Sequence, residues 1–224
     1  MGNIYPFIYI HIRSNFRFMI AIIFFTILFS ANSTDLLLDM YSIKNWNFLE
    51  EIDNKKIYQA DCVLNNDQYI MIEQEINKEH NNIISIIQAV SNYDNILSNK
   101  NIKTKLLLSN GDTSIAKQTI TNAIPFTRDR MYIYKLYTLN KNRVDWFLID
   151  DFNYQIDGFQ NKNIHKLSFG AGSWEIKEND NKKLLIYRMY LDDEVNLPIM
   201  FMQKMRINYA VDIFNDVLTF SKGE

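Results

Sequence analysis

Segments rich in alternating apolar and polar residues dominate the chain beyond residue 100, and this pattern predicts β-strands. Turn-forming residues separate neighbouring segments, as at Asn110-Gly111-Asp112 and Asn179-Asp180-Asn181. Because the connections are short, neighbouring strands are expected to pair antiparallel. Two similar segments precede residue 100. The predicted strands are 57–64, 69–76, 102–109, 115–123, 129–139, 143–152, 165–176 and 184–192.

Three other segments repeat their apolar residues every three or four positions, which predicts amphipathic helices. These helices are expected at residues 35–52, 79–97 and 197–220. Asn81 or Asn82 is suited to cap the second helix, and Asn196 the third, with Pro198 in its first turn. The order of elements indicates an α+β protein, in which a long amphipathic helix packs on a curved antiparallel sheet.

The N-terminus carries a different pattern, an almost wholly apolar run at residues 18–31. Arg13 and Arg17 precede the run, and no acidic residue occurs before Asp35. Ala31-Asn32-Ser33 then offers small residues for a cut after Ser33. A basic start, a short apolar run and a small-residue exit are typical of a secretory signal.

Two other interpretations of this segment stay open. It is also compatible with an uncleaved membrane anchor or with a buried helix of the domain, and Met19 is a second candidate start. We therefore divide the chain into residues 1–33, a signal peptide or N-terminal membrane anchor, and one domain at residues 34–224. Export to the periplasm or the extracellular space is the expected localisation, with residues 18–31 as the anchor if they are retained.

Charge and cysteine content narrow the classes of function. The 224 residues include 24 basic and 26 acidic ones, so the charge is too balanced for phosphate-neutralising nucleic-acid binding. Residues 34–224 carry 22 basic and 26 acidic residues, a net charge of −4, so at most transient membrane contact through a local apolar site is expected. Cys62 is the one cysteine, and its apolar neighbours indicate a small buried hydrophobe.

Short motifs between residues 40 and 221 follow a recognisable order. They are Trp46 before Ile57-Tyr58, Val90-Ser91-Asn92-Tyr93-Asp94, Pro125-Phe126-Thr127-Arg128-Asp129, Gly172-Ser173-Trp174-Glu175-Ile176, and Leu185-Ile186-Tyr187 through Asp192 to Leu197-Pro198. Together they resemble START-related lipid-transfer domains of the helix-grip (SRPBCC) superfamily, which also includes polyketide cyclases. Pro125, Arg128 and Asp129 give the sharpest match. A glycine pair of the family is replaced by residues 193–196, and Ile96-Leu97 stand where a tryptophan is expected.

The resemblance implies a helix-grip fold, with a hydrophobic cavity between the sheet and the C-terminal helix that holds one ligand such as a lipid or sterol. On the helix, Met202, Met205 and Tyr209 are the leading candidates for the cavity wall, because methionine adapts to variable apolar shapes. Ordinary core packing is the alternative for all of these aromatic and methionine positions. On the sheet, the candidates are Trp146, Phe169, Trp174 and Tyr187.

Two charged positions have competing interpretations. Strict alternation puts Arg188 on one face with Leu184, Ile186 and Tyr190, and inside an apolar cavity it would need an acidic partner or an anionic ligand. Alternatively, that face points outward. Arg128-Asp129-Arg130 opens a strand, either as a polar anchor for a lipid head group or as an ion pair that fixes the strand end, and the ion pair is the favoured interpretation.

Candidate catalytic groups are sparse. His80 and His165 are not spaced as metal ligands, and the sequence contains no nucleophile elbow or phosphate-binding glycine loop. We therefore expect a monomer without metal or cofactor that binds, and in one version transfers, a lipid or another hydrophobic small molecule. Two alternatives remain: a cyclase or aromatase that uses His165, Tyr187 and Arg188, and a membrane-tethered interaction domain whose own side chains fill the cavity.

Overall fold

The computed structural model describes residues 32–64, 67–77, 80, 82–121, 128–149, 164–179, 182–192 and 198–223. In this part of the chain, ten strands form one sheet in the order β1-β2-β3-β10-β9-β7-β6-β5-β4, and β8 pairs with β6. Every pair is antiparallel except β6 with β8. The strands are β1 (Asn47–Ile52), β2 (Lys55–Cys62), β3 (Asp67–Ile76), β4 (Ile102–Asn110), β5 (Thr113–Ile120), β6 (Asp129–Asn140), β7 (Arg143–Leu148), β8 (Ile164–Lys166), β9 (Gly170–Asn179) and β10 (Lys182–Leu191).

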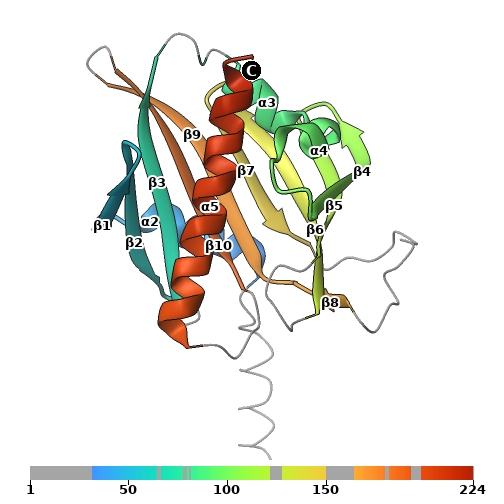
Figure 1. The fold of residues 1–224 in the computed structure, drawn as a ribbon, viewed down its shortest axis with the longest axis horizontal. Helices are drawn as coiled ribbons and strands as arrows, with labels where there is room; N and C mark the ends of the chain where they lie inside the picture. Colours follow the sequence, from blue (N-terminus) through green and yellow to red (C-terminus); the bar gives the residue numbers. More distant parts are fainter. Residues whose placement is uncertain are drawn as a thin grey trace, which may run out of the picture. The chain divides into compact units, whose positions relative to one another are not determined.

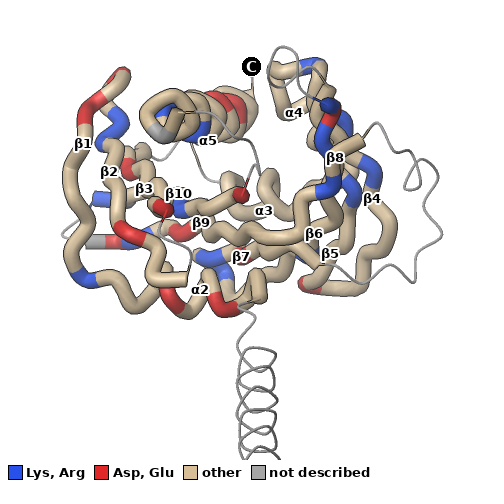
Figure 2. Tube along the Cα trace, turned by 90° about the horizontal axis from the view of Figure 1, so that it is seen from below, with Lys and Arg blue, Asp and Glu red and all other residues tan. Residues whose placement is uncertain are grey.

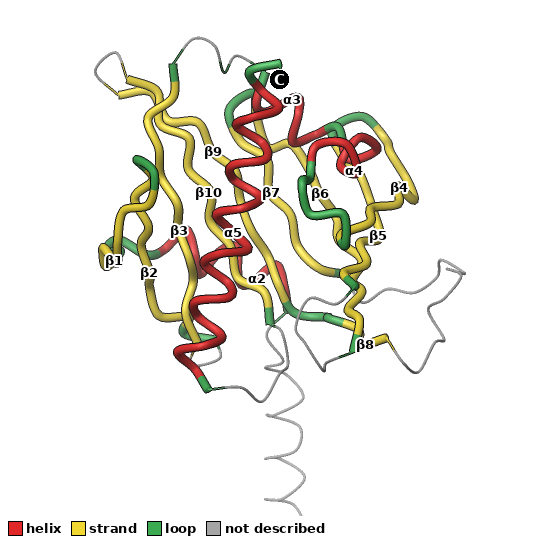
Figure 3. The backbone as a smooth tube through the Cα atoms, viewed as in Figure 1, coloured by secondary structure: helices red, strands yellow, loops and turns green. Residues whose placement is uncertain are grey.

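Helices cover both faces of the sheet. The long helix α5 (Ile199–Ser221) runs along one face of the sheet (Figure 1). Figure 3, in which the strands are yellow, shows the curved sheet behind it. The view from below shows α2 (Ser33–Ser42) on the opposite face (Figure 2). The short helices α3 (Ile83–Gln88) and α4 (Tyr93–Ile96), with the 3-10 turn η1 (Val90–Asn92) between them, contact α5 and the β4 side of the sheet. The predicted α+β fold is therefore confirmed.

Two hydrophobic clusters result, one on each face. The inner cluster lies between the sheet and α5 and includes Leu185, Tyr187 and Met189 of β10. The outer cluster lies beneath α2 and includes Tyr190 of the same strand and the predicted buried thiol Cys62, which is 2% exposed. Because successive side chains of a strand point to opposite faces, β10 contributes to both clusters and is buried along most of its length.

The first predicted helix is half wrong. Residues 35–52 were expected to be one helix, but α2 ends at Ser42 and residues 47–52 form the edge strand β1. The reason is the turn between β1 and β2, where Asp53 and Asn54 have positive φ angles of 47° and 63°. Two such residues make a tight hairpin, and Asp and Asn tolerate that conformation well.

The second predicted helix, 79–97, is broken into α3, η1 and α4. Its apolar stripe is buried as expected, but Ala89 leaves the helical conformation with a ψ of 57°. The Tyr93 hydroxyl donates a hydrogen bond to the carbonyl of Ile87 across this break. Asn82 precedes α3 without a side-chain capping bond, and Asn81 lies outside the described residues.

Three further boundaries differ from the predictions. The strand expected at 165–176 is divided into β8 and β9, because β8 pairs with β6 whereas β9 pairs with β7 and β10. The strand expected at 143–152 ends as β7 at Leu148. Pro198 occupies the N-cap position of α5, and the predicted cap Asn196 lies outside the described residues, as do residues 1–31 with Met19.

Gly172 allows an indole to lie flat against the sheet. The residue on β9 is paired with Trp146 on β7. A Cβ atom at position 172 would lie 2.6 Å from Nε1 and Cε2 of Trp146 and 2.7 Å from the carbonyl oxygen of Arg188. The glycine of the Gly172–Ile176 motif is therefore required by close packing.

Replacing Gly172 by alanine is expected to lower the free energy of unfolding by about 1–3 kcal/mol, because the added methyl group overpacks the sheet against Trp146. Urea denaturation of the purified chain measures the change. Gly111→Asn is the control, since a Cβ atom at position 111 would meet nothing within 4 Å, and asparagine tolerates the φ of 56° found there. Equal stability of Gly172→Ala and the wild type would contradict this explanation.

Candidate functional site

An apolar cavity of about 70 Å³ lies between α5 and the inner face of the sheet. Alternation along β6 brings Tyr132, Tyr134 and Leu136 to this face. We call it the aromatic cavity. Its wall consists of Ile87, Tyr93, Ile96, Leu97, Gln118, Tyr132, Tyr134, Leu136, Trp146, Trp174, Tyr187, Met189, Leu191, Tyr209, Ile213 and Val217.

Two aromatic residues of the cavity wall, Trp174 and Tyr187, belong to a stack of three rings that joins the sheet to α5. Trp174 of β9 lies 4.0 Å from Tyr187 of β10, centroid to centroid, with an angle of 14° between the planes. Phe214 of α5 lies 5.7 Å from Trp174 at 19°. Stacked rings add to the burial energy and fix the distance between helix and sheet.

Polar atoms in this cavity are few and belong mostly to tyrosines. The Tyr132 hydroxyl donates to Oε1 of Gln118 and lies 3.4 Å from the hydroxyl of Tyr209. The buried hydroxyl of Tyr134 has no hydrogen-bond partner among the described residues. A buried donor without a partner is costly, so Tyr134 offers an open position to a polar group of a ligand.

Burial keeps these tyrosines neutral. It raises the pKa of Tyr132, Tyr134 and Tyr187 well above the usual value of 10.0, and neighbouring tyrosines raise it further. Each hydroxyl therefore remains a proton donor throughout the physiological pH range.

A second cavity, of about 240 Å³, adjoins the first. We call it the arginine cavity, because Arg130 and Arg206 both line it. Nη1 of Arg206 forms an ion pair with Oδ2 of Asp67 at 2.5 Å. The other lining residues are Asn99, Ile120, Met189, Leu191, Met205, Asn208, Tyr209 and Asp212. Because Met189, Leu191 and Tyr209 line both cavities, the two spaces are neighbours under α5.

Most of the predicted wall residues lie around these cavities. The aromatic cavity is lined by Trp146, Trp174, Tyr187 and Tyr209, and Met205 lines the arginine cavity. Met202, also on α5, is only 5% exposed but is not part of the wall of either cavity. Its burial agrees with the alternative of core packing.

Two predicted wall residues lie on the wrong face. Arg188 follows Tyr187 on β10 and therefore points to the outer face, where its Nη1 lies 2.8 Å from Oε2 of Glu175. Phe169 packs there against Tyr190, with 5.9 Å between ring centroids. Arg188 therefore lies outside the cavity, but it is buried, with 6% exposure, and not on a half-exposed face. The structure does not bring together the set of His165, Tyr187 and Arg188 that a cyclase was expected to use.

The Pro125–Asp129 motif divides between described and undescribed residues. Pro125 lies outside the described part of the chain, Arg128 is exposed, and Asp129 is half-buried at the start of β6. The sequence favoured an ion pair within Arg128-Asp129-Arg130, but Arg130 lines the arginine cavity together with residues of α5.

The inner residues of β6 and Gln118 of β5 were not predicted from the sequence. A signal was present, since Arg130, Tyr132, Tyr134 and Leu136 occupy every second position of one strand. The alternation alone does not indicate which of the two faces of the strand meets the long helix.

Metal clusters and membrane-spanning helices do not occur in the described part of the chain. Among these residues, no group of three or more His, Cys, Asp and Glu side chains is arranged to hold a metal ion. No helix in the same ranges is both long and apolar enough to cross a membrane.

Solved structures share this architecture, although no family model and no curated protein sequence matches the chain. A STAR-related lipid transfer protein fragment from Xanthomonas axonopodis superposes with a TM-score of 0.64 at 9% identity, covering 79% of this chain and 98% of that one. Human STARD10 gives 0.61 at 9% identity, with 86% and 82% covered. Human StAR-related lipid transfer protein 5 also gives 0.61 at 9%, with 85% and 95% covered.

These similarities define the fold. The chain has a START-like helix-grip fold, as the short motifs predicted. At 9% identity the relationship concerns the architecture, and the same architecture supports different functions.

The raised tyrosine pKa values predict alkaline destabilisation. The unfolded chain releases its tyrosine protons near pH 10, whereas the folded chain holds them to higher pH, so stability is full below pH 10 and falls as pH rises above it. Tyr134→Phe should reduce this loss and leave stability at neutral pH unchanged or higher, since it removes an unpartnered hydroxyl. Denaturation at several pH values, combined with tyrosinate absorbance, measures both effects. Ionisation of Tyr134 near pH 10 in the folded chain would contradict the prediction.

Proposed function

We propose that the chain binds one hydrophobic small molecule, such as a lipid, between the inner face of the sheet and α5. The observation that carries the proposal is the aromatic cavity with the unpartnered hydroxyl of Tyr134, adjoining the larger arginine cavity. The fold shared with solved lipid-transfer proteins supports it.

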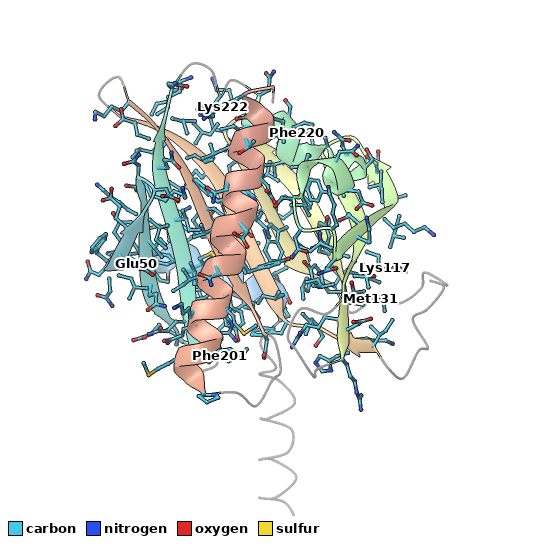
Figure 4. The ribbon with its side chains drawn as sticks, viewed as in Figure 1. Glu50, Lys117, Met131, Phe201, Phe220 and Lys222 are labelled. Carbon is cyan, nitrogen blue, oxygen red and sulfur yellow. The ribbon has the colours of Figure 1, made fainter. Side chains whose placement is uncertain are left out.

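Binding would draw its free energy from apolar burial, at roughly 25 cal/mol per Å² before the entropic costs of association. Pockets for drug-sized ligands measure roughly 300–1,000 Å³, which is more than the 70 Å³ of the aromatic cavity. Uptake of a ligand whose hydrocarbon part enters the aromatic cavity therefore requires α5 to move away from the sheet. Exposed apolar side chains at its N-terminal end, Met200 and Phe201, give the helix a surface for transient membrane contact, and Figure 4 shows Phe201 and Phe220 near opposite ends of α5.

The proposal describes an exported, monomeric binding protein without a catalytic step. The apolar run at residues 18–31, with Arg13 and Arg17 before it, supports export. Transfer of the ligand between membranes is an extension of the same proposal and requires that α5 open at a membrane surface.

Filling the aromatic cavity should block binding. Ile213 is a half-buried residue of α5 in the cavity wall, and Ile213→Trp is expected to weaken the binding of an apolar ligand roughly tenfold or more. Native mass spectrometry and a fluorescent-lipid displacement assay on the full chain measure the effect. Leu38→Trp is the control, because Leu38 is 73% exposed on α2. Wild-type protein that takes up no apolar ligand, or unchanged binding by Ile213→Trp, would refute the proposal.

A further inference from the structure

Arg130 is a buried cation without hydrogen bonds at two of its donor nitrogens. The residue is 3% exposed, and its Nε and Nη1 atoms are buried without a hydrogen-bond partner in the part of the chain that the structure describes. Arginine stays protonated in proteins, so burial does not remove the charge. Buried charged donors without partners cost considerable free energy, which favours any anion that can reach them.

The backbone places this cation next to the aromatic cavity. Arg130 is two residues before Tyr132 on β6 and thus on the same inner face, opposite Ile120 of β5. His165 of β8 is its neighbour on the other side. The guanidinium thus lies at the side of the hollow where β6 begins, and not in the outer layer that holds Arg188.

Among the described residues, the positive charge of Arg130 in the arginine cavity is not offset by an ion pair, in contrast to that of Arg206. Arg206 contributes a second guanidinium from α5, paired with Asp67. Asp212 is the carboxylate in the wall; its side chain is exposed, and partial desolvation together with the nearby Asp216 raises its pKa. It does not bond to Nε or Nη1 of Arg130.

Size and continuity fit an amphiphile. A water molecule needs roughly 10–15 Å³ of such space, so a cavity of about 240 Å³ has room for a head group and its first methylenes. Met189, Leu191 and Tyr209 line both cavities, so a chain attached to that head group can continue toward the aromatic cavity.

We propose that Arg130 binds the anionic head group, a carboxylate or a phosphate monoester, of an amphiphile whose hydrocarbon chain lies in the aromatic cavity. This inference rests on the proposed function and names the class of its ligand. Carboxylate and phosphate oxygens match the planar donors of a guanidinium and form charge-assisted hydrogen bonds with it.

The test compares three ligands of equal chain length on the full chain: a fatty acid, a monoalkyl phosphate and the fatty alcohol. Affinities are measured by calorimetry and by quenching of tryptophan fluorescence. An anionic ligand is expected to bind about tenfold to a hundredfold more tightly than the alcohol. The tighter of the two anions identifies the head group, and this comparison needs no variant.

The matched variants are Arg130→Met and Arg128→Met. Arg130→Met should abolish the preference for the anion and leave the alcohol affinity within about threefold, whereas Arg128→Met, at an exposed position, should keep the preference. The melting temperature of Arg130→Met should stay the same or rise, because two buried donors without partners are removed.

The outcomes separate the two proposals. If the alcohol binds wild-type protein as tightly as both anions, the role of Arg130 is refuted while the proposed function stands. A preference for the anion that survives in Arg130→Met also refutes the role of Arg130. If the melting temperature of this variant falls as well, Arg130 has a structural role. If none of the three ligands binds, both proposals fail.

Discussion

The stacking of Phe214 on Trp174 holds α5 against the sheet, and the inner half of the domain depends on this contact. Phe214 is completely buried, and Trp174 also stacks on Tyr187 of the neighbouring strand. Without the helix, the inner face would expose a large apolar surface to water. The same contact limits the aromatic cavity to about 70 Å³, so the interaction that stabilises the fold also restricts the space for a ligand.

The buried arginines of the domain differ in whether a carboxylate pairs with them. Beneath α2, Arg188 is paired with Glu175, and Arg143 is paired with Asp145, which is 1% exposed. Both of these outer-face arginines therefore have a counter-charge close by. In the arginine cavity, Arg206 is likewise paired with Asp67, whereas Arg130 is 3% exposed and two of its donor nitrogens have no partner among the described residues. This contrast distinguishes a structural ion pair from a position suited to an anionic ligand.

The sequence predicted the long regular elements well and the short irregular ones poorly. The final helix was expected at 197–220 and occurs at 199–221, since a sustained apolar stripe leaves little ambiguity. The prediction of one helix at 35–52 is wrong beyond Ser42, because Asp53 and Asn54 form a tight turn that pairs residues 47–52 with β2. In such cases tertiary pairing overrides a helical spacing that only a few residues support.

By itself, the sequence determined which residues share a face, because side chains alternate along a strand whatever surrounds it. It thus separated Tyr187 from Arg188. Only the tertiary structure decided which face meets α5 and which meets α2, because helix packing depends on contacts between segments far apart in the chain. That choice placed Arg188 in an ion pair of the outer layer and Arg130 in the cavity.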